Sequence, residues 1–212
     1  MDRLLSDAAR SYLPYGTDGV LIEFSDNEAV LSAFDLLQST GRFAEQVPGA
    51  TTLYVKSKET NGSPTKLVQS LFQQVPVGQR PTHDVRTHTI PVVYDGEDLA
   101  SVAELVGVPI SELIDRHVGP TYTVAFLGFS RSFPYFEGLD PLLRVPRLAT
   151  PRLAVPARSV AMGAGFTGIY PMASPGGWRL LGRTTTDLFN ANDDPPSALR
   201  HGDRVQFHRV RP

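Results

Sequence analysis

The chain has 212 residues, a formal net charge of −2 and no cysteine. The absence of cysteine excludes disulfides, thiolate nucleophiles and thiolate metal ligands, and the basic residues are too scattered for a nucleic-acid-binding surface. Hydrophobic residues make up 41% and charged residues 20% of the sequence, which is the usage of a globular protein and excludes a disordered chain.

The N-terminal part alternates between strand and helix signals. Residues 20–24 and 51–56 have the alternating pattern of strands with one buried face. Between them, Ser25 and Glu28 have the spacing of a capping box, and Gly41 ends the helix that they begin. This order predicts a small α/β domain.

A second helix begins at Ser63-Pro64, because proline at the first helical position loses no hydrogen bond. Pro76, Pro81 and the polar residues around them then predict a linker. We therefore expect two domains, an N-terminal α/β domain over residues 1–80 and a second domain over residues 86–212.

The second domain begins with a strand at residues 88–94, two short helices at residues 99–106 and 110–117, and a strand at residues 121–129. The helix pair has the spacing of a helix-turn-helix, but its second helix has no basic face to read DNA. His117 ends that helix, where the helix dipole favours a cation, so a structural role is favoured over a catalytic one.

From Phe133 onward, proline and glycine recur every few residues and leave no room for a long helix. Short strands at residues 159–162, 178–183 and 204–210 fit between the turns. Many short strands separated by turn signals predict a closed β-barrel. The expected fold class is α+β, with the small α/β domain followed by a C-terminal barrel.

Residues 163–168 match the dinucleotide-binding pattern G-x-G-x-x-G. That pattern binds pyrophosphate only when a helix follows at once, and here Pro171 and the run 175–177 follow instead. We interpret the segment as a glycine-rich turn between barrel strands, whose backbone N–H groups remain able to bind an anion.

Metal, membrane and export signals are absent from the sequence. The five histidines include no i, i+4 pair on a helix beside an acid, so no metal site is predicted. The N-terminal residues lack the apolar core of a signal peptide, and no run of about 20 apolar residues occurs that would span a membrane. We expect a cytoplasmic protein with no membrane or nucleic-acid partner.

Three segments concentrate aromatics, prolines and glycines, at residues 133–136, 167–171 and 174–178. We interpret them as rigid loops. Aromatic side chains on such loops form a ligand cleft or a partner surface, or else they plug the ends of the barrel. Composition alone does not separate these interpretations.

These segments also carry a family resemblance. The stretches concerned are residues 167–171 (TGIYP), 174–178 (SPGGW), 194–196 (DPP) and 202–205 (GDRV). They resemble the KipI family, whose members are named as the B subunit of 5-oxoprolinase, as allophanate hydrolase subunit 1 or as kinase inhibitor. The resemblance covers about residues 16–210 and is specific from Pro91 onward.

The resemblance implies that residues 86–212 form a cyclophilin-like barrel of the carboxyltransferase subdomain C and D type. It also implies a separately encoded partner similar to KipA or the C subunit of 5-oxoprolinase (a C-type chain), with a third chain similar to the A subunit (an A-type chain). The expected activity of the complex is the ATP-dependent opening of 5-oxoproline to glutamate, with the isolated chain inactive. Two alternatives remain: a binding-only inhibitor of a sensor histidine kinase, and an allophanate hydrolase or urea carboxylase-related subunit.

Two places depart from the family pattern. Where members usually have Gly-Phe-x-Pro-Gly-Phe-x-Tyr, residues 130–132 are Ser-Arg-Ser, and Phe166 stands where glutamine is usual. Loss of an amide that pairs with a polar substrate costs about 1 kcal/mol or more. These changes imply either a different substrate or a copy that has lost turnover.

The candidate substrate or partner site combines aromatic walls with arginines, whose forked donors suit a carboxylate or a carboxyphosphate-like anion. We expect it at the mouth of the barrel, and the sequence assigns no catalytic residue. Arg152 and Arg183 have an alternative structural role, bonded to barrel carbonyls. The candidate residues are Arg131, Phe133, Tyr135, Arg152, Thr167, Tyr170, Trp178 and Arg183.

Overall fold

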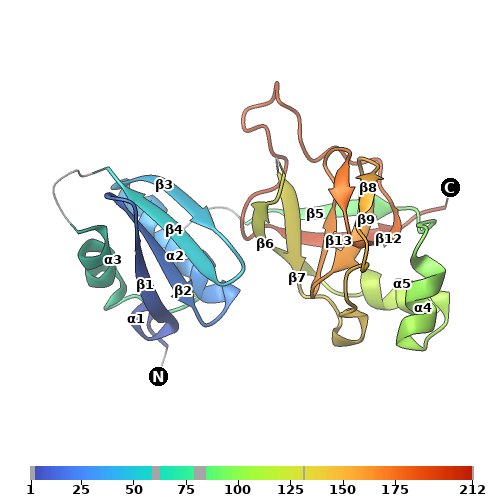
Figure 1. Cartoon of the computed structure of the whole chain (residues 1–212), viewed down its shortest axis with the longest axis horizontal. Coiled ribbons are helices and arrows are strands. Elements are labelled where there is room, and N and C mark those ends of the chain that lie inside the picture. The colour runs from blue at the N-terminus through green and yellow to red at the C-terminus, as the bar shows by residue number, and fades with distance from the viewer. Residues whose placement is uncertain (1–2, 59–62, 79–84, 131, 212) are drawn as a thin grey trace. The chain divides into compact units, whose positions relative to one another are not determined.

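The chain divides into two units, Met1–Asp84 and Val85–Pro212 (Figure 1). The structure is a computed structural model that describes residues 3–58, 63–78, 85–130 and 132–211. Arg131, one of the candidate site residues, lies outside the described residues. No described helix combines the length and the apolar character that crossing a bilayer requires.

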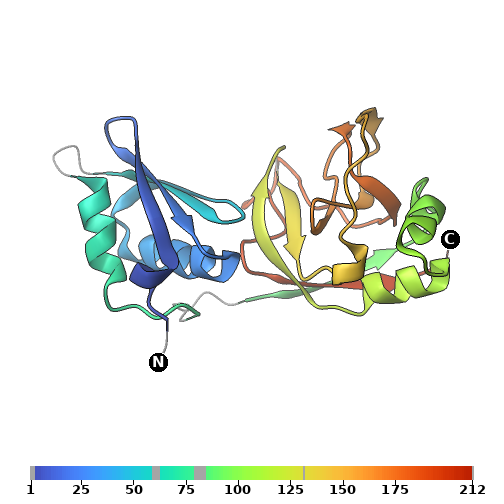
Figure 2. The same ribbon diagram turned by 60° about the horizontal axis from the view of Figure 1, so that its bottom comes forward.

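The N-terminal unit is a four-stranded antiparallel sheet in the order β1-β2-β4-β3, with helices packed on one face (Figure 2). Inward side chains of the two central strands, among them Ile22 and Val55, are fully buried in one cluster with Leu37 and Phe72 of the helices. The elements are α1 (Leu5–Ala8), β1 (Ala9–Tyr15), β2 (Gly19–Phe24), α2 (Asn27–Thr40), β3 (Phe43–Pro48), β4 (Thr52–Ser57) and α3 (Pro64–Phe72).

The start of α2 differs by one residue from the sequence prediction. Asp26 caps the helix in place of Ser25, since its carboxylate accepts the backbone N–H of Ala29 at 3.0 Å. The Ser25 hydroxyl instead donates to that carboxylate at 2.8 Å. The Arg3 guanidinium beside Asp26 lowers its pKa to about 2. Gly41, with φ of 65°, ends the helix as predicted.

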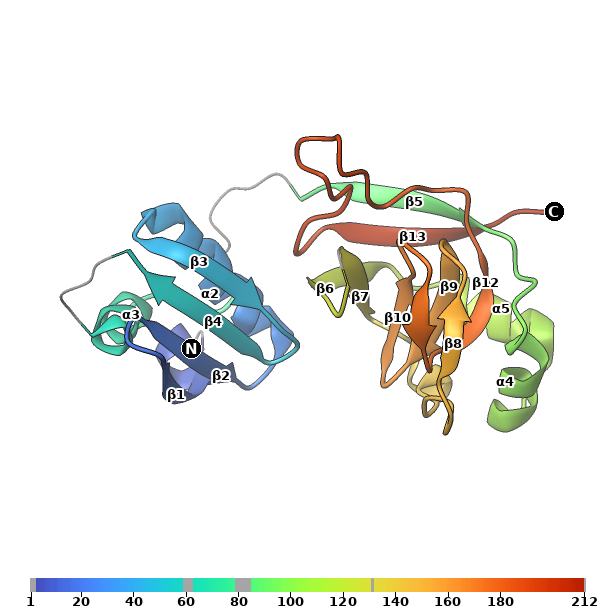
Figure 3. The same ribbon diagram turned by 45° about the horizontal axis from the view of Figure 1, so that its top comes forward.

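The second unit is a seven-stranded barrel in the order β12-β9-β10-β7-β6-β13-β5 (Figure 3). Neighbouring strands are antiparallel except β13 and β5, which run parallel. The predicted α+β class with a C-terminal barrel is confirmed. Its strands are β5 (Thr87–Val92), β6 (Tyr122–Gly128), β7 (Phe133–Glu137), β9 (Ser159–Gly163), β10 (Phe166–Ile169), β12 (Arg179–Arg183) and β13 (Arg204–Arg209).

The barrel closes between its two edge strands. Val93, directly after β5, and Arg183, at the end of β12, exchange both backbone hydrogen bonds at 2.9 Å. Gly182 permits this approach, because a Cβ there would lie 2.2 Å from the carbonyl oxygen of Val93. Helices α4 (Leu99–Val106) and α5 (Ile110–Val118), both close to their predicted bounds, pack against the core that fills the barrel.

A second, smaller buried cluster lies on the outer face of the barrel wall. Because side chains alternate along a strand, Ala161 points outward where Val160 and Met162 fill the interior. A two-stranded ribbon, β8 (Arg152–Val155) paired with β11 (Ser174–Gly176), contributes Val155 to this outer cluster. The segments predicted as rigid loops are therefore largely strands β7, β10 and β11, since pairing with neighbouring strands of the sheet and ribbon outweighs their prolines.

Candidate functional site

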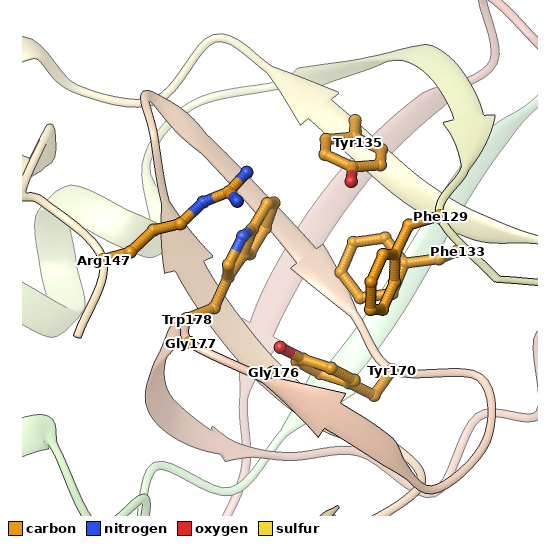
Figure 4. A pocket seen from close by; sticks show the side chains of 8 residues that line it. All are labelled: Phe129, Phe133, Tyr135, Arg147, Tyr170, Gly176, Gly177 and Trp178. Carbon is orange, nitrogen blue, oxygen red and sulfur yellow. The ribbon is translucent and has the colours of Figure 1, made fainter. Parts of the chain in front are cut away.

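A cavity of about 60 Å³ lies at the outer face of the barrel wall, within the smaller buried cluster (Figure 4). Aromatic rings make up most of its wall, and a single arginine side chain contributes to the lining. The lining residues are Phe129, Phe133, Tyr135, Arg147, Tyr170, Gly176, Gly177 and Trp178. Four of the eight candidate residues therefore come together here.

Strand geometry and one glycine place the rings. Phe133 and Tyr135 stand two residues apart on β7 and so point to the same, outer face. Tyr170 directly follows β10, and Trp178 directly precedes β12. Gly168 of β10 leaves room between them, because a Cβ there would lie 3.1 Å from atoms of both the Phe133 and the Trp178 rings. This glycine in the TGIYP stretch is required by the packing of the cavity wall.

The rings hold one another in edge-to-face contacts centred on Phe133. Its centroid lies 4.9 Å from that of Tyr170 and 5.2 Å from those of Trp178 and Tyr135. Each such pair contributes about 0.5–1.5 kcal/mol beyond burial. The wall is therefore rigid before any ligand arrives.

The two tyrosine hydroxyls of the cavity are hydrogen-bond donors at neutral pH. Burial raises the pKa of Tyr135 and of Tyr170, an effect that the Arg147 charge opposes without reversing. The backbone N–H of Trp178 also opposes this rise for Tyr170. No carboxylate or imidazole occurs among the described lining residues, so this cavity offers binding groups and no obvious general base.

Thr167 lies inside the barrel, away from the cavity. Its hydroxyl donates to the Ala161 carbonyl at 3.1 Å, so its lone pair accepts the Nε2–H of His117 at 2.8 Å. The His117 Nδ1 then accepts the Tyr94 hydroxyl at 2.7 Å. Burial lowers the pKa of His117 to about 3. His117 thus has a structural role, as its position predicts, but as a neutral core residue and not as a cation on the helix dipole.

Arg152 and Arg183 form ion pairs outside the cavity lining. Arg152 contacts the buried carboxylate of Asp98 at 2.9 Å, with Glu97 and the Trp178 carbonyl as weaker partners. Arg183 is 63% exposed and contacts Asp95 at 2.8 Å. The first ties the segment before α4 to the ribbon, and the second lies at the closure of the barrel. Arg131 lies outside the described residues.

The sequence did not single out Phe129 or Arg147. Phe129 follows β6 with φ of 61° and stays 68% exposed while its ring contacts Phe133 at 5.8 Å. Arg147 belongs to the proline-rich stretch before β8, and the sequence prediction chose Arg152, the first residue of β8, instead. Arg147 lies at the cavity because the N–H of the next residue, Leu148, is bonded to the carbonyl of Gly177. No local sequence pattern indicates that bond.

Phe166 and Ser132, one from each departure from the family pattern, lie next to lining residues of this cavity. Phe166, in place of glutamine, packs edge-on against Tyr135 at 5.6 Å and Phe126 at 5.7 Å. Phe126 in turn stacks on Tyr135 at 4.0 Å. The Phe166 ring therefore packs, together with Phe126, against the Tyr135 ring and helps to fix its orientation. In the β6–β7 connection, Ser132 keeps φ at 58°, a backbone conformation that suits the glycine usual there.

The glycine-rich segment after β9 is a tight turn, as interpreted from the sequence. Ala164 and Gly165 have φ of 53° and 84° and connect the paired strands β9 and β10. A strand follows in place of the helix that a dinucleotide site requires. The segment is a hairpin of the barrel wall.

Comparison with known proteins gives the family. The family described as carboxyltransferase domain, subdomain C and D, matches residues 10–199. The chain belongs to this family. Within it, the B subunit of 5-oxoprolinase from Escherichia coli O157:H7 is 39% identical over 166 residues, which cover 77% of this chain and 76% of that protein. The protein of the same name from Haemophilus influenzae is 48% identical over 121 residues, which cover 56% of this chain and 57% of that protein.

Solved structures share the fold of this carboxyltransferase-family chain. TTHA0988 has a TM-score of 0.77 at 34% identity, and the match covers 92% of this chain but only 40% of that one. The urea amidolyase of K. lactis has a TM-score of 0.69 at 16% identity, covering 97% of this chain and 16% of its own. At that identity the likeness shows the fold alone. This chain therefore corresponds to one part of these longer proteins.

Proposed function

We propose that this chain is the B-type subunit of an ATP-dependent 5-oxoprolinase, which opens the lactam of 5-oxoproline to give glutamate. The observation that carries the proposal is the 39% identity to the 5-oxoprolinase B subunit over 77% of this chain and 76% of that protein. In the proposed assembly a C-type chain, similar to KipA, is the direct partner. An A-type chain completes the complex.

The chemistry of the cavity supports a shared active site. Hydrolysis of an amide needs a positioned water and a group that takes its proton. The described lining residues supply rings, hydroxyls and one guanidinium, and include no carboxylate or imidazole. We therefore propose that this chain binds the substrate and that the partner supplies the base. On this account the isolated chain is inactive.

The charge of the cavity bears on where ATP binds. The described lining residues are mostly aromatic rings with a single guanidinium, which is little positive charge for a triphosphate. We therefore propose that ATP binds elsewhere in the assembled complex. The described residues contain no cluster of three His, Asp or Glu side chains that would hold a metal ion, and we propose no metal for this chain.

The test is co-expression of this chain with the C-type and A-type chains, followed by an assay for glutamate formed from 5-oxoproline. We expect this chain and the C-type chain to co-elute in size-exclusion chromatography at micromolar concentration, because a stable interface buries at least about 1,000 Å². We also expect glutamate only when ATP and all three chains are present.

An assembled complex that forms no glutamate with ATP would refute the proposal. Omission of each chain in turn is the control for contaminating activity. If the complex is inactive and this chain instead inhibits autophosphorylation of a sensor histidine kinase, the binding-only alternative replaces the enzyme subunit.

A further inference from the structure

The lining of the cavity contains one cation, Arg147. Its guanidinium carbon lies 6.0 Å from the centroid of the Trp178 ring, over the ring face. In the part of the chain that the structure describes, no carboxylate lies within ion-pair distance of it. By contrast, Arg152, Arg158 and Arg183 are each paired with an acid. The charge of Arg147 is therefore available to an anionic ligand.

The backbone on both sides of Arg147 is fixed to the cavity wall. The next residue, Leu148, donates its N–H to the Gly177 carbonyl at 2.7 Å. The carbonyl before it, of Pro146, accepts from the Arg179 side chain at 3.3 Å. Gly163 lies beneath, where a Cβ would come within 3.2 Å of the Arg147 Cγ. The backbone and the first part of the Arg147 side chain are thus positioned before a ligand binds, which reduces the entropy lost on binding.

The other polar groups of the cavity also donate. The Tyr170 ring lines the cavity, and its hydroxyl has one proton to donate. Figure 4 shows the Tyr135 oxygen directed into the space between Trp178 and Phe133. A guanidinium and two hydroxyls select a ligand group that only accepts hydrogen bonds, and an ionised carboxylate is such a group.

We propose that Arg147, Tyr135 and Tyr170 form a carboxylate-binding site for a small cyclic acid. The carboxylate is held by the guanidinium and the hydroxyls, and a compact ring lies against the Phe133 and Trp178 side chains. This assignment rests on the proposed function in naming 5-oxoproline, a five-membered lactam with one carboxylate, as the ligand. It makes Arg147 a specificity-determining residue that discriminates acids from neutral lactams.

Trp178 provides a built-in probe, because it is the only tryptophan of the chain. The isolated full-length chain is titrated with 5-oxoproline, with 2-pyrrolidinone, which is the same ring without the carboxylate, and with acetate. Trp178 fluorescence and calorimetry are read in parallel, so that one readout is independent of the indole. We expect saturable binding of 5-oxoproline in about the millimolar range, and binding of 2-pyrrolidinone at least about tenfold weaker.

Three variants test the residue itself. Arg147→Gln removes the charge and should weaken 5-oxoproline binding at least about tenfold while leaving the weak binding of 2-pyrrolidinone unchanged. Arg147→Lys keeps the charge but not the fork, and should fall between the two. Arg144→Gln is the matched control, since Arg144 is exposed on the same stretch and outside the cavity lining. It should bind like the unmodified chain.

Several results would overturn the assignment: equal binding of 5-oxoproline and 2-pyrrolidinone, no binding by either readout up to about 100 mM, or unchanged binding in Arg147→Gln. The outcome is separable from that of the proposed function. Arg147-dependent binding with an inactive complex sinks the function and keeps the site. An active complex whose kcat and KM are unaltered by Arg147→Gln sinks the site and keeps the function.

Discussion

Replacing Thr167 by valine tests whether the TGIYP stretch serves the substrate or the core. Thr167 is completely buried, and its hydroxyl joins the Ala161 carbonyl at 3.1 Å to the His117 ring at 2.8 Å. Valine keeps the branched shape and removes only the hydroxyl. The Nε2–H of His117 then loses its acceptor inside the barrel, and the Ala161 carbonyl loses one donor.

The cost follows from these two losses. A buried donor left without a partner costs about 1–3 kcal/mol, and a lost neutral hydrogen bond about 1 kcal/mol. Strand β9, which contains Ala161, stays paired with β10 and β12, so the backbone itself is not disrupted. We therefore expect the free energy of unfolding to fall by about 2–3 kcal/mol in total. For a domain of this size, that lowers the melting temperature by roughly 6–12 °C.

The assay is urea and thermal unfolding followed by the fluorescence of Trp178. Thr167→Ser is the matched control, because it keeps the hydroxyl and loses one methyl group at about 1 kcal/mol. Thr185→Val makes the same chemical change at an exposed position and should stay within about 0.5 kcal/mol. If Thr167→Val is no less stable than Thr167→Ser but loses 5-oxoproline binding, Thr167 contacts substrate and the reasoning fails.

Four further outcomes are expected. His117 has a pKa of about 3 in the folded chain against an ordinary value of 6.5, so between these pH values the unfolded chain binds one more proton. The free energy of unfolding should therefore fall from pH 6.5 toward pH 3 by up to about 1.4 kcal/mol per pH unit. Urea unfolding of His117→Asn at the same pH values should lack this fall. Ser132→Gly should stabilise the chain by about 1 kcal/mol in the same assay, because it relieves a positive φ. Arg152→Lys should lower the melting temperature while Arg183→Lys, with its exposed pair, should not. Limited proteolysis should cut first within residues 76–88 and release a folded C-terminal fragment; first cuts inside the barrel strands would contradict that division.

The parts of the fold that the sequence predicts are those with a local signal. Helices α2, α3 and α4 have caps or glycine stops within the chain itself, β9 is a short, mostly apolar run between turns, and β13 alternates buried and exposed residues. Strand β1 has no fully buried side chain, β3 buries only its two end residues, and neither strand alternates regularly. They exist because β2 and β4 offer them backbone partners, which no window of sequence contains.

The candidate site also contains residues with a local sequence signal and a residue without one. The sequence singles out Phe133, Tyr135, Tyr170 and Trp178 because aromatics are concentrated in proline- and glycine-rich segments, but composition does not decide whether those rings line a cavity or plug the barrel. Which arginine joins them could not be predicted, since that depends on which acids lie nearby. Asp98 and Asp95 engage two of the three arginines favoured from sequence, Arg152 and Arg183, and the third lies outside the described residues. Arg147 reaches the cavity because the N–H of its neighbour Leu148 is bonded to the Gly177 carbonyl.

The strand order of the barrel has a consequence for how the protein is made. Strand β5 lies between β13 and the closing bridge at Arg183, so both of its neighbours come from residues that are synthesised about a hundred positions later. Contacts of such high sequence separation form slowly and late. During translation, β5 must wait with its edge unpaired until residues 204–209 have left the ribosome.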